Sequence, residues 1–467
     1  MNRGKFTSGS LRLKVPHYAP QRSPSLASLI KFCGIILLVY FIVASYLLSR
    51  GERKTLLKDP SESTLRDLVR SIRTKVTFRA RRVPAVSELL DLDPHMFSVI
   101  PLHFLPDVKN PCWYEELRGN VSAYPYGSNL YSRLSSNIQN TFERLSATFK
   151  KQLILHDGKL QRLRCLPYFY IIGQAKCGTT DLYERLRLHP DVHLTPPKEP
   201  HWWSRRKFGI IRPGDPPLTR FPLDHYLDLF DPVAQQIQHR LLGNSSISSS
   251  IITGEASAST MWDNMAWSYL HDISREAEPP SLVQDFIHAV QPDARLIAIL
   301  RDPVERLYSD YLYFGTSNES TLDFHQKVCE SLRLFDACLR DAGLRACVYS
   351  STLYYAMSVR LHVGLYVVFI LDWLSVFSRD QLLVLRLEDH AANLTHSMNR
   401  VFHFLQLGPV SEQTERLISR RPVANTRDPS DRKLGPMKPV TRELLRQFYA
   451  PFNQKLSAVL QDESFMW

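Results

Sequence analysis

The sequence lacks several patterns that would indicate a common function. None of the seven cysteines belongs to a C-x-x-C pair, which makes a zinc ribbon improbable. No internal repeat is present, so a repeat architecture is not expected. Acidic residues are scarce only near the N-terminus, where residues 1–82 contain 17 Lys and Arg but 4 Asp and Glu. The rest of the chain has 41 basic and 42 acidic residues, so nucleic acid is not expected as a partner and any acidic ligand needs a local site.

The N-terminal region has the organisation of a membrane-anchored protein. Residues 32–49, "FCGIILLVYFIVASYLLS", form a run of 18 residues without a charge, and as a helix they would span about 27 Å. A cleaved signal peptide is disfavoured because the run is long and no small-x-small cleavage site follows it. We therefore expect a cytoplasmic basic tail (1–31), a transmembrane signal-anchor helix (32–49), a stem (50–95) and a lumenal domain (96–467).

The orientation of this anchor depends on weaker signals. Basic residues flank both ends of the apolar run, so the positive-inside rule does not decide the topology. Four N-x-S/T glycosylation sequons favour a lumenal body, and they begin at Asn120, Asn244, Asn318 and Asn393. In that compartment Cys329, Cys338 and Cys347 are close enough in sequence for local disulfides, but the sequence does not determine their pairing.

The body alternates short β-rich runs with helical patterns. The runs "YFYII" (168–172), "ARLIAIL" (294–300) and "QLLVLRL" (381–387) each lead into a tight turn and a helix. This order predicts an α/β fold with a central parallel sheet and helices on both faces. Ligands of such sheets bind at the carboxyl ends of the strands, where all three turns fall.

The first turn, within "IIGQAKCGTTDLYERL" (171–186), has the features of a phosphate-binding loop. Gly173 and Gly178 have the spacing of a nucleotide-triphosphate loop, but the lysine, Lys176, lies inside the loop and not after the second glycine. A helix that starts at Thr179 would present free N–H groups to a phosphate, with two threonine hydroxyls beside them. A turn without a ligand is the alternative. The expected phosphate contacts are Lys176, Cys177, Gly178, Thr179 and Thr180.

The second turn, "LRDPVERLYSDY", predicts a second anion site. Asp302 and Pro303 are suited to the N-cap and the first position of a helix. An arginine fork at Arg301 and a hydroxyl two turns later at Ser309 would suit a separate phosphate group. The alternative is an ion pair between Arg301 and a nearby aspartate. Two such sites at strand ends suggest a nucleotide that is phosphorylated at two positions.

With these two turns, the stretches "KEPHWW", "GEASASTMWDN" and "LEDHAANL" make the chain resemble the Golgi carbohydrate sulfotransferases. The likeness runs from about residue 95 to the C-terminus. It implies a P-loop-like three-layer sulfotransferase domain that uses 3′-phosphoadenosine-5′-phosphosulfate (PAPS), with the 5′-phosphosulfate in the first turn and the 3′-phosphate in the second. Lys176 would then reach the oxygen that bridges sulfur and phosphate, where negative charge grows in a loose in-line transition state. This placement disfavours a P-loop kinase.

The resemblance also implies a general base. Glu199 is the first candidate, and His201 is the second because its reference pKa of about 6.5 suits a slightly acidic lumen. An ion pair between Glu199 and Lys198 with a purely structural role is the alternative.

Further positions are expected to contact the acceptor or to close over the nucleotide. Indole faces and guanidinium forks suit sugar rings and sulfate groups, although a buried tryptophan pair would be an equally ordinary arrangement. The expected acceptor contacts are Trp202, Trp203, Arg205, Arg206, Glu255 and Ser257, the last two acting directly or from behind the site. A polar loop at 425–437 is a candidate lid. Its nucleotide contacts would be Arg432, Lys433 and Gly435.

The resemblance implies a single-pass type II Golgi membrane protein that transfers sulfate to the 6-hydroxyl of N-acetylgalactosamine 4-sulfate in chondroitin or dermatan sulfate. No metal is required by this chemistry, although a divalent cation could screen the polyanionic acceptor. A homodimer is compatible with the sequence. A heparan-type or other glycosaminoglycan O-sulfotransferase, a P-loop kinase and a non-catalytic glycan-binding protein are the alternatives.

Overall fold

The computed structural model describes most of the chain from residue 62 onward. The described residues are 62–117, 125–194, 198–212, 219–243, 250–271, 276–315, 319–426, 429 and 433–467. The predicted tail and membrane span at 1–49 lie outside them. Within the described ranges, no helix has the length and apolar character needed to cross a bilayer.

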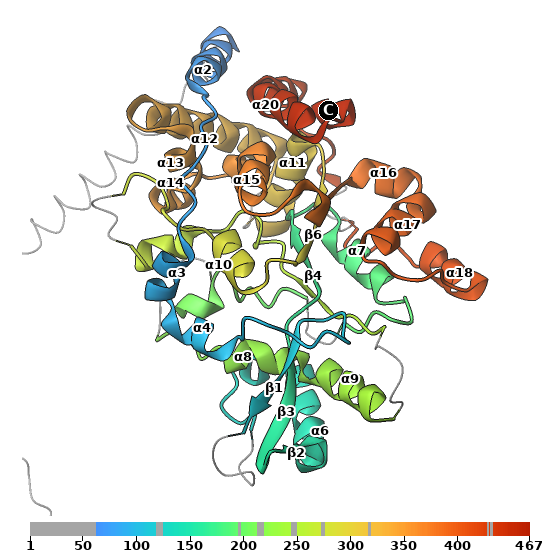
Figure 1. The fold of residues 1–467 in the computed structure, drawn as a ribbon. Helices are drawn as coiled ribbons and strands as arrows, with labels where there is room; N and C mark the ends of the chain where they lie inside the picture. Colours follow the sequence, from blue (N-terminus) through green and yellow to red (C-terminus); the bar gives the residue numbers. More distant parts are fainter. Residues whose placement is uncertain are drawn as a thin grey trace, which may run out of the picture. The chain divides into compact units, whose positions relative to one another are not determined.

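A four-stranded parallel sheet lies at the centre of the unit (Figure 1). Its strands are β5 (Gly254–Ala256), β4 (Phe169–Gly173), β6 (Arg295–Leu300) and β7 (Leu382–Arg386), in that spatial order. The three strands predicted from β-rich runs are confirmed as β4, β6 and β7. Just before β5, Ile252 forms an isolated bridge with Val192.

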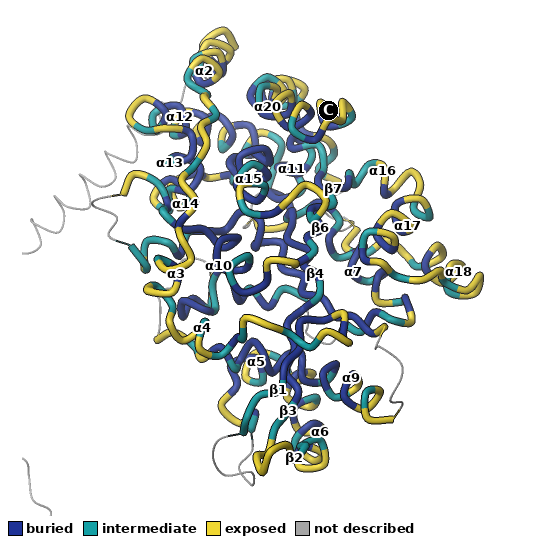
Figure 2. The backbone as a smooth tube through the Cα atoms, in the orientation of Figure 1, coloured by how far each residue is buried: buried dark blue, intermediate teal, exposed yellow. Residues whose placement is uncertain are grey.

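The two faces of this sheet are covered by different helices. Because side chains alternate along a strand, one set packs against α7 (Thr179–Leu186), α17 (Leu394–Phe404) and α18 (Glu412–Arg420). The other set packs against α10 (Val283–Val290), α11 (Pro303–Phe314), α15 (Tyr366–Leu374) and α20 (Pro439–Leu460). Figure 2 shows the strands as a buried centre between these layers. The predicted parallel α/β arrangement with helices on both faces is therefore confirmed.

Part of the predicted stem belongs to the folded unit. Helix α2 (Glu62–Lys75) packs against α12 (Thr321–Asp341) and α20. Its buried residues Leu65, Val69 and Ile72 recur at helical spacing and join the main core. The compact unit thus begins at Glu62, so the described residues of the expected stem pack with the folded domain.

A second, antiparallel sheet was not predicted. Its order is β1 (Cys112–Glu116), β3 (Lys159–Cys165) and β2 (Ile154–His156). Asp157 and Gly158 connect β2 to β3 with positive φ values of 51° and 73°. An Asp-Gly pair is the usual signal for such a hairpin turn, so this sheet was open to prediction.

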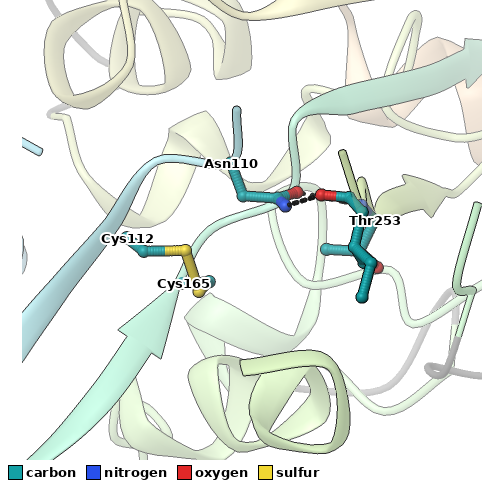
Figure 3. Close-up of a disulfide and its surroundings, with 5 residues drawn as sticks. Asn110, Cys112, Cys165 and Thr253 are labelled. Atoms are coloured by element: carbon teal, nitrogen blue, oxygen red, sulfur yellow. Dashed lines mark hydrogen bonds between the residues drawn. A yellow bond between two sulfur atoms is a disulfide. The ribbon is translucent and has the colours of Figure 1, made fainter. Parts of the chain in front are cut away.

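A disulfide holds two strands of the antiparallel sheet together, and polar contacts beside it reach the segment that leads into the parallel sheet. A disulfide links Cys112 to Cys165 across the β1–β3 ladder (Figure 3). Next to it, the Asn110 amide donates to the Ile251 carbonyl at 2.7 Å and its oxygen accepts from the Thr253 N–H at 2.9 Å. The two hydrogen bonds of Asn110 connect the residues just before β1 to the segment that leads into β5.

A second disulfide links Cys338 to Cys347, which selects one of the local pairings that the sequence left open. Cys329 is buried and is not disulfide-bonded, and its sulfur lies 3.6 Å from His325 Nε2.

The Cys112–Cys165 disulfide should contribute more stability than the Cys338–Cys347 disulfide. The two bonds close loops with sequence separations of 53 and 9 residues. Loop-closure entropy then predicts losses of about 4 kcal/mol and about 2.5 kcal/mol when each pair is replaced by alanine. Urea unfolding followed by tryptophan fluorescence measures both losses. Equal losses, or the reverse order, would contradict this explanation.

Candidate active site

A cavity of about 830 Å³ lies at the carboxyl ends of the parallel strands. Segments that follow β4, β5, β6 and β7 all contribute to its lining. The structure therefore brings together residues that the sequence placed in separate motifs. The predicted site residues that line it are Lys176, Gly178, Thr179, Thr180, Glu199, His201, Arg205, Arg301 and Ser309.

The turn between β4 and α7 has the geometry of an anion site. Gly178 is the N-cap of α7 with φ 90°, and a Cβ there would lie 2.7 Å from Cδ1 of Leu387, so no other residue fits easily. Within the described part of the chain, no side chain caps this helix start. The N–H groups of the first turn have no partner inside the helix. They are therefore available to an anion in the cavity, beside the hydroxyls of Thr179 and Thr180.

The start of α11 forms the second turn as predicted. The Asp302 carboxylate accepts from the Val304 N–H at 2.8 Å, and Pro303 occupies the first helical turn. Among the described residues, Arg301 forms no salt bridge with Asp302 or with Asp310. Asp310 pairs instead with Arg360. Arg301 thus lines the cavity without the ion pair to a neighbouring aspartate that was the alternative.

Glu199 and His201 are held tightly against the segment that follows β5. Both have left-handed backbones, with φ 66° and 52°. The Glu199 N–H donates to the Ala256 carbonyl at 2.7 Å, and one carboxylate oxygen accepts from the Ala258 N–H at 2.8 Å. The other oxygen forms an ion pair with Lys198. This is the Glu199–Lys198 ion pair that was the structural alternative to a general base. Both residues nevertheless line the cavity.

The environment of His201 differs from the sequence expectation. Its Nδ1 shares a hydrogen bond of 2.7 Å with Ser259 Oγ, and its Nε2 lies 3.6 Å from the Glu199 carboxylate. Burial, together with the positive charges of Arg205, Arg206 and Lys198, lowers the pKa of His201 to about 3. The expectation that this imidazole titrates near the pH of a slightly acidic lumen is therefore wrong. A neutral, weakly basic His201 is a poorer proton acceptor than a carboxylate.

The prediction that Trp202 and Trp203 contact the acceptor is also wrong. Trp202 and Trp203 are 2% and 1% exposed and do not line the cavity. Trp202 stacks on Tyr226 with ring centroids 5.5 Å apart, and the Trp203 indole N–H donates to the Tyr226 hydroxyl. Both indoles are core residues, so neither can present a face to a sugar.

Two other predicted residues point away from the cavity. Arg206 donates to the carbonyls of Ile210 and Ile211 and stabilises its own loop. The Cys177 side chain is buried and its sulfur lies 3.7 Å from the Tyr366 hydroxyl. Burial raises the pKa of the Cys177 thiol to about 12, so this side chain is neither a nucleophile nor a direct ligand.

Glu255 and Ser257 lie behind the site and not in its lining. Ser257 Oγ accepts from the His201 N–H at 2.9 Å and donates to the Glu255 carboxylate. Both side chains are buried, which excludes direct contact with an acceptor and leaves the indirect role that the sequence analysis allowed.

The predicted lid is described only in part. Arg432 lies outside the described residues, and Lys433 and Gly435 do not line the cavity. The Gly435 carbonyl instead accepts from the Tyr308 hydroxyl at 3.0 Å. Asn425, at the start of the same loop, does line the cavity and donates to Thr180 Oγ1 at 3.1 Å.

Sequence reasoning missed a buried polar network behind the first turn. The Asp181 carboxylate receives hydrogen bonds from Arg185, His390 and the Ala424 N–H. Burial alone would raise the pKa of Asp181, but these donors hold it below its ordinary value. Arg185 was readable as an i, i+4 partner of Asp181, whereas His390 and Ala424 come from distant segments and gave no local signal.

Among the described residues, no group of three or more His, Cys, Asp and Glu is arranged to hold a metal ion. The expectation that no metal is required stays a prediction.

Glu255 predicts a pH-dependent stability. Burial, with a smaller effect from the Glu199 charge, raises the pKa of Glu255 from 4.5 to about 8. Between these values the folded protein keeps a proton that the unfolded chain has released, so stability from this group is present below pH 4.5 and lost towards pH 8. The variant Glu255→Gln stays uncharged and should show a smaller drop in Tm from about pH 5 to about pH 8. Parallel Tm curves for the two proteins would refute the assignment.

Comparison with known proteins gives a consistent family. Residues 166–443 match the family described as "Sulfotransferase domain". Carbohydrate sulfotransferase 15 of Homo sapiens is 56% identical over 86% of this chain and 72% of its own length, and its Mus musculus counterpart is 55% identical over the same shares. Heparan sulfate glucosamine 3-O-sulfotransferase 3A1 of Mus musculus is 28% identical over 65% of this chain and 64% of its own. A solved sulfotransferase from Alicyclobacillus acidocaldarius is 24% identical, with a TM-score of 0.42 over 65% of this chain and 99% of that one.

Proposed function

This chain belongs to the sulfotransferase family and is a PAPS-dependent carbohydrate O-sulfotransferase, and we propose that it sulfates the 6-hydroxyl of N-acetylgalactosamine 4-sulfate in chondroitin or dermatan sulfate. The observation that supports sulfate transfer is a single cavity lined by residues of all the predicted motifs. It contains the start of α7, the Arg301–Ser309 pair and the two candidate catalytic side chains Lys176 and Glu199.

The residues present fit the sulfate donor. The uncapped start of α7 and the hydroxyls of Thr179 and Thr180 suit its 5′-phosphosulfate, and Arg301 with Ser309 suits its 3′-phosphate. PAPS supplies an activated sulfo group when it is bound. Lys176 would stabilise the negative charge that develops on the departing phosphate, which is the role of a preorganised cation in a largely dissociative transfer.

Glu199 is the better candidate for the general base. Its carboxylate is fixed by the Ala258 N–H and Lys198, so it needs little reorganisation to accept the proton of a sugar hydroxyl. His201 is the weaker base because its pKa is lowered to about 3 by burial and nearby cations. We assign His201 to orienting the carboxylate, from which it lies 3.6 Å away.

The cavity carries fixed cations that suit an anionic acceptor. Arg205 donates to Asp263 at 2.6 Å, and Arg360 donates to Asp310, so both guanidinium groups are positioned before a ligand arrives. Such preorganisation lowers the ordering cost of binding a sulfated or carboxylated sugar. The choice of N-acetylgalactosamine 4-sulfate itself depends on the resemblance of the sequence motifs.

The proposal includes the Golgi lumen as the site of action. Residues 32–49 would be the type II signal anchor, with 1–31 in the cytoplasm. Two disulfides in the folded unit support an oxidising compartment.

The acceptor is tested by disaccharide analysis. The purified enzyme is incubated with labelled PAPS and with desulfated chondroitin, 4-sulfated chondroitin, dermatan sulfate or desulfated heparan chains. We expect label on C6 of N-acetylgalactosamine units that already carry a 4-sulfate. Label on desulfated chondroitin or heparan chains alone would reject this acceptor while retaining the enzyme class, and Mg²⁺-dependent ATP turnover without sulfate transfer would favour a kinase.

The base is tested by Glu199→Gln, which keeps the shape of the side chain and removes its basicity. Transfer should fall by roughly 100-fold or more, since general base catalysis contributes this much, while affinity for adenosine 3′,5′-bisphosphate stays within a few-fold. His201→Ala is the matched comparison and should retain more activity. If only the histidine variant loses transfer, the two roles are reversed.

A further inference from the structure

Tyr313 contacts the candidate catalytic lysine directly. The Lys176 ammonium lies 3.4 Å from the centroid of the Tyr313 ring. Tyr313 is 61% exposed and lines the cavity at the end of α11, so it is not part of the packed core. An exposed aromatic side chain in this position needs an explanation other than core packing.

Helix α11 links this ring to the second anion site. Ser309 and Tyr313 are four residues apart, so they lie on the same helix face, and Arg301 immediately precedes the N-cap residue Asp302. The opposite side of α11 is held in the core by residues such as Leu307 and Tyr308. One rigid element therefore sets the distance between the predicted 3′-phosphate site and the ring that contacts Lys176.

The face of the Tyr313 ring can hold the Lys176 ammonium group in one position. A lysine side chain is flexible, and ordering it costs conformational entropy. The Asp310 carboxylate is close enough for the Lys176 charge to lower its pKa, but it already bonds to Arg360 and pairs with Arg306. The face of an aromatic ring attracts an ammonium group through the ring quadrupole, so it orders the cation without forming an ion pair of its own.

We propose that Tyr313 is the positioning residue of Lys176, holding its ammonium in the cavity through the face of the aromatic ring. This inference depends on the proposed function, because it assumes that Lys176 stabilises the departing phosphate. The neighbouring contact, Arg360 at 4.4 Å from the Phe314 ring centroid, shows the same arrangement for a second cavity cation.

The test measures steady-state sulfate transfer by the full chain. Tyr313→Leu should lower kcat by roughly 3- to 30-fold, the range of a cation–π contact, with smaller changes in KM for PAPS and for the acceptor. Tyr313→Phe retains the ring and should stay within about twofold of the wild type. Tyr269→Leu, at another partly exposed tyrosine that does not line the cavity, is the matched control and should leave kcat unchanged.

A double-mutant cycle separates positioning from a general structural effect. In a Lys176→Ala background the Tyr313→Leu change should have almost no further effect on kcat, because the contact it removes is already absent. Thermal unfolding of each variant establishes that it is folded.

The inference is overturned if Tyr313→Leu matches the wild type, if Tyr313→Phe is as impaired as Tyr313→Leu, or if the two losses add in the double variant. A folded wild-type protein that transfers no sulfate from PAPS to any glycosaminoglycan would overturn the proposed function, and this inference with it. If the wild type transfers sulfate and the Tyr313 variants have the same kcat, this inference alone is overturned and the proposed function stands.

Discussion

The parallel pairing of β4 with its two neighbours is the constraint on which the site depends. Ile171 pairs with Ala256 on β5, and Gly173 pairs with Ala298 on β6. Parallel strands end at the same edge of a sheet, so this register places the phosphate-type turn, the Glu255 segment and Arg301 next to one another. The turns that follow these strands therefore line one cavity.

The site also depends on which groups contact its positively charged side chains. Lys198 is paired with Glu199, Arg205 with Asp263 and Arg360 with Asp310, while Lys176 is held by an uncharged ring. Paired cations are fixed in position but partly neutralised. Lys176, the cation that would act on the departing group, has the face of the Tyr313 ring against its ammonium.

Behind this surface, buried polar groups fix the two ends of the cavity. Asp181 ties α7 to His390 and Ala424, which come from segments more than 200 residues later in the chain. Ser257 connects the His201 backbone to the buried Glu255. Satisfied networks of this type hold a backbone in one arrangement, which is what the left-handed residues Glu199 and His201 require.

The sequence alone determined the features that arise from neighbouring residues. Apolar runs predicted β4, β6 and β7, the Asp302–Pro303 pair predicted the start of α11, and the glycine spacing predicted the turn before α7. Tertiary structure decided the environment of each side chain. Trp202 and Trp203 are buried in the core, and burial lowers the pKa of His201. Lys176 contacts Tyr313 because the two segments, far apart in the chain, pack together. Burial by segments distant in the chain is the main cause of these properties, and for His201 the charges of its sequence neighbours Lys198, Arg205 and Arg206 add to it. No local pattern of residue types shows which side chains become buried.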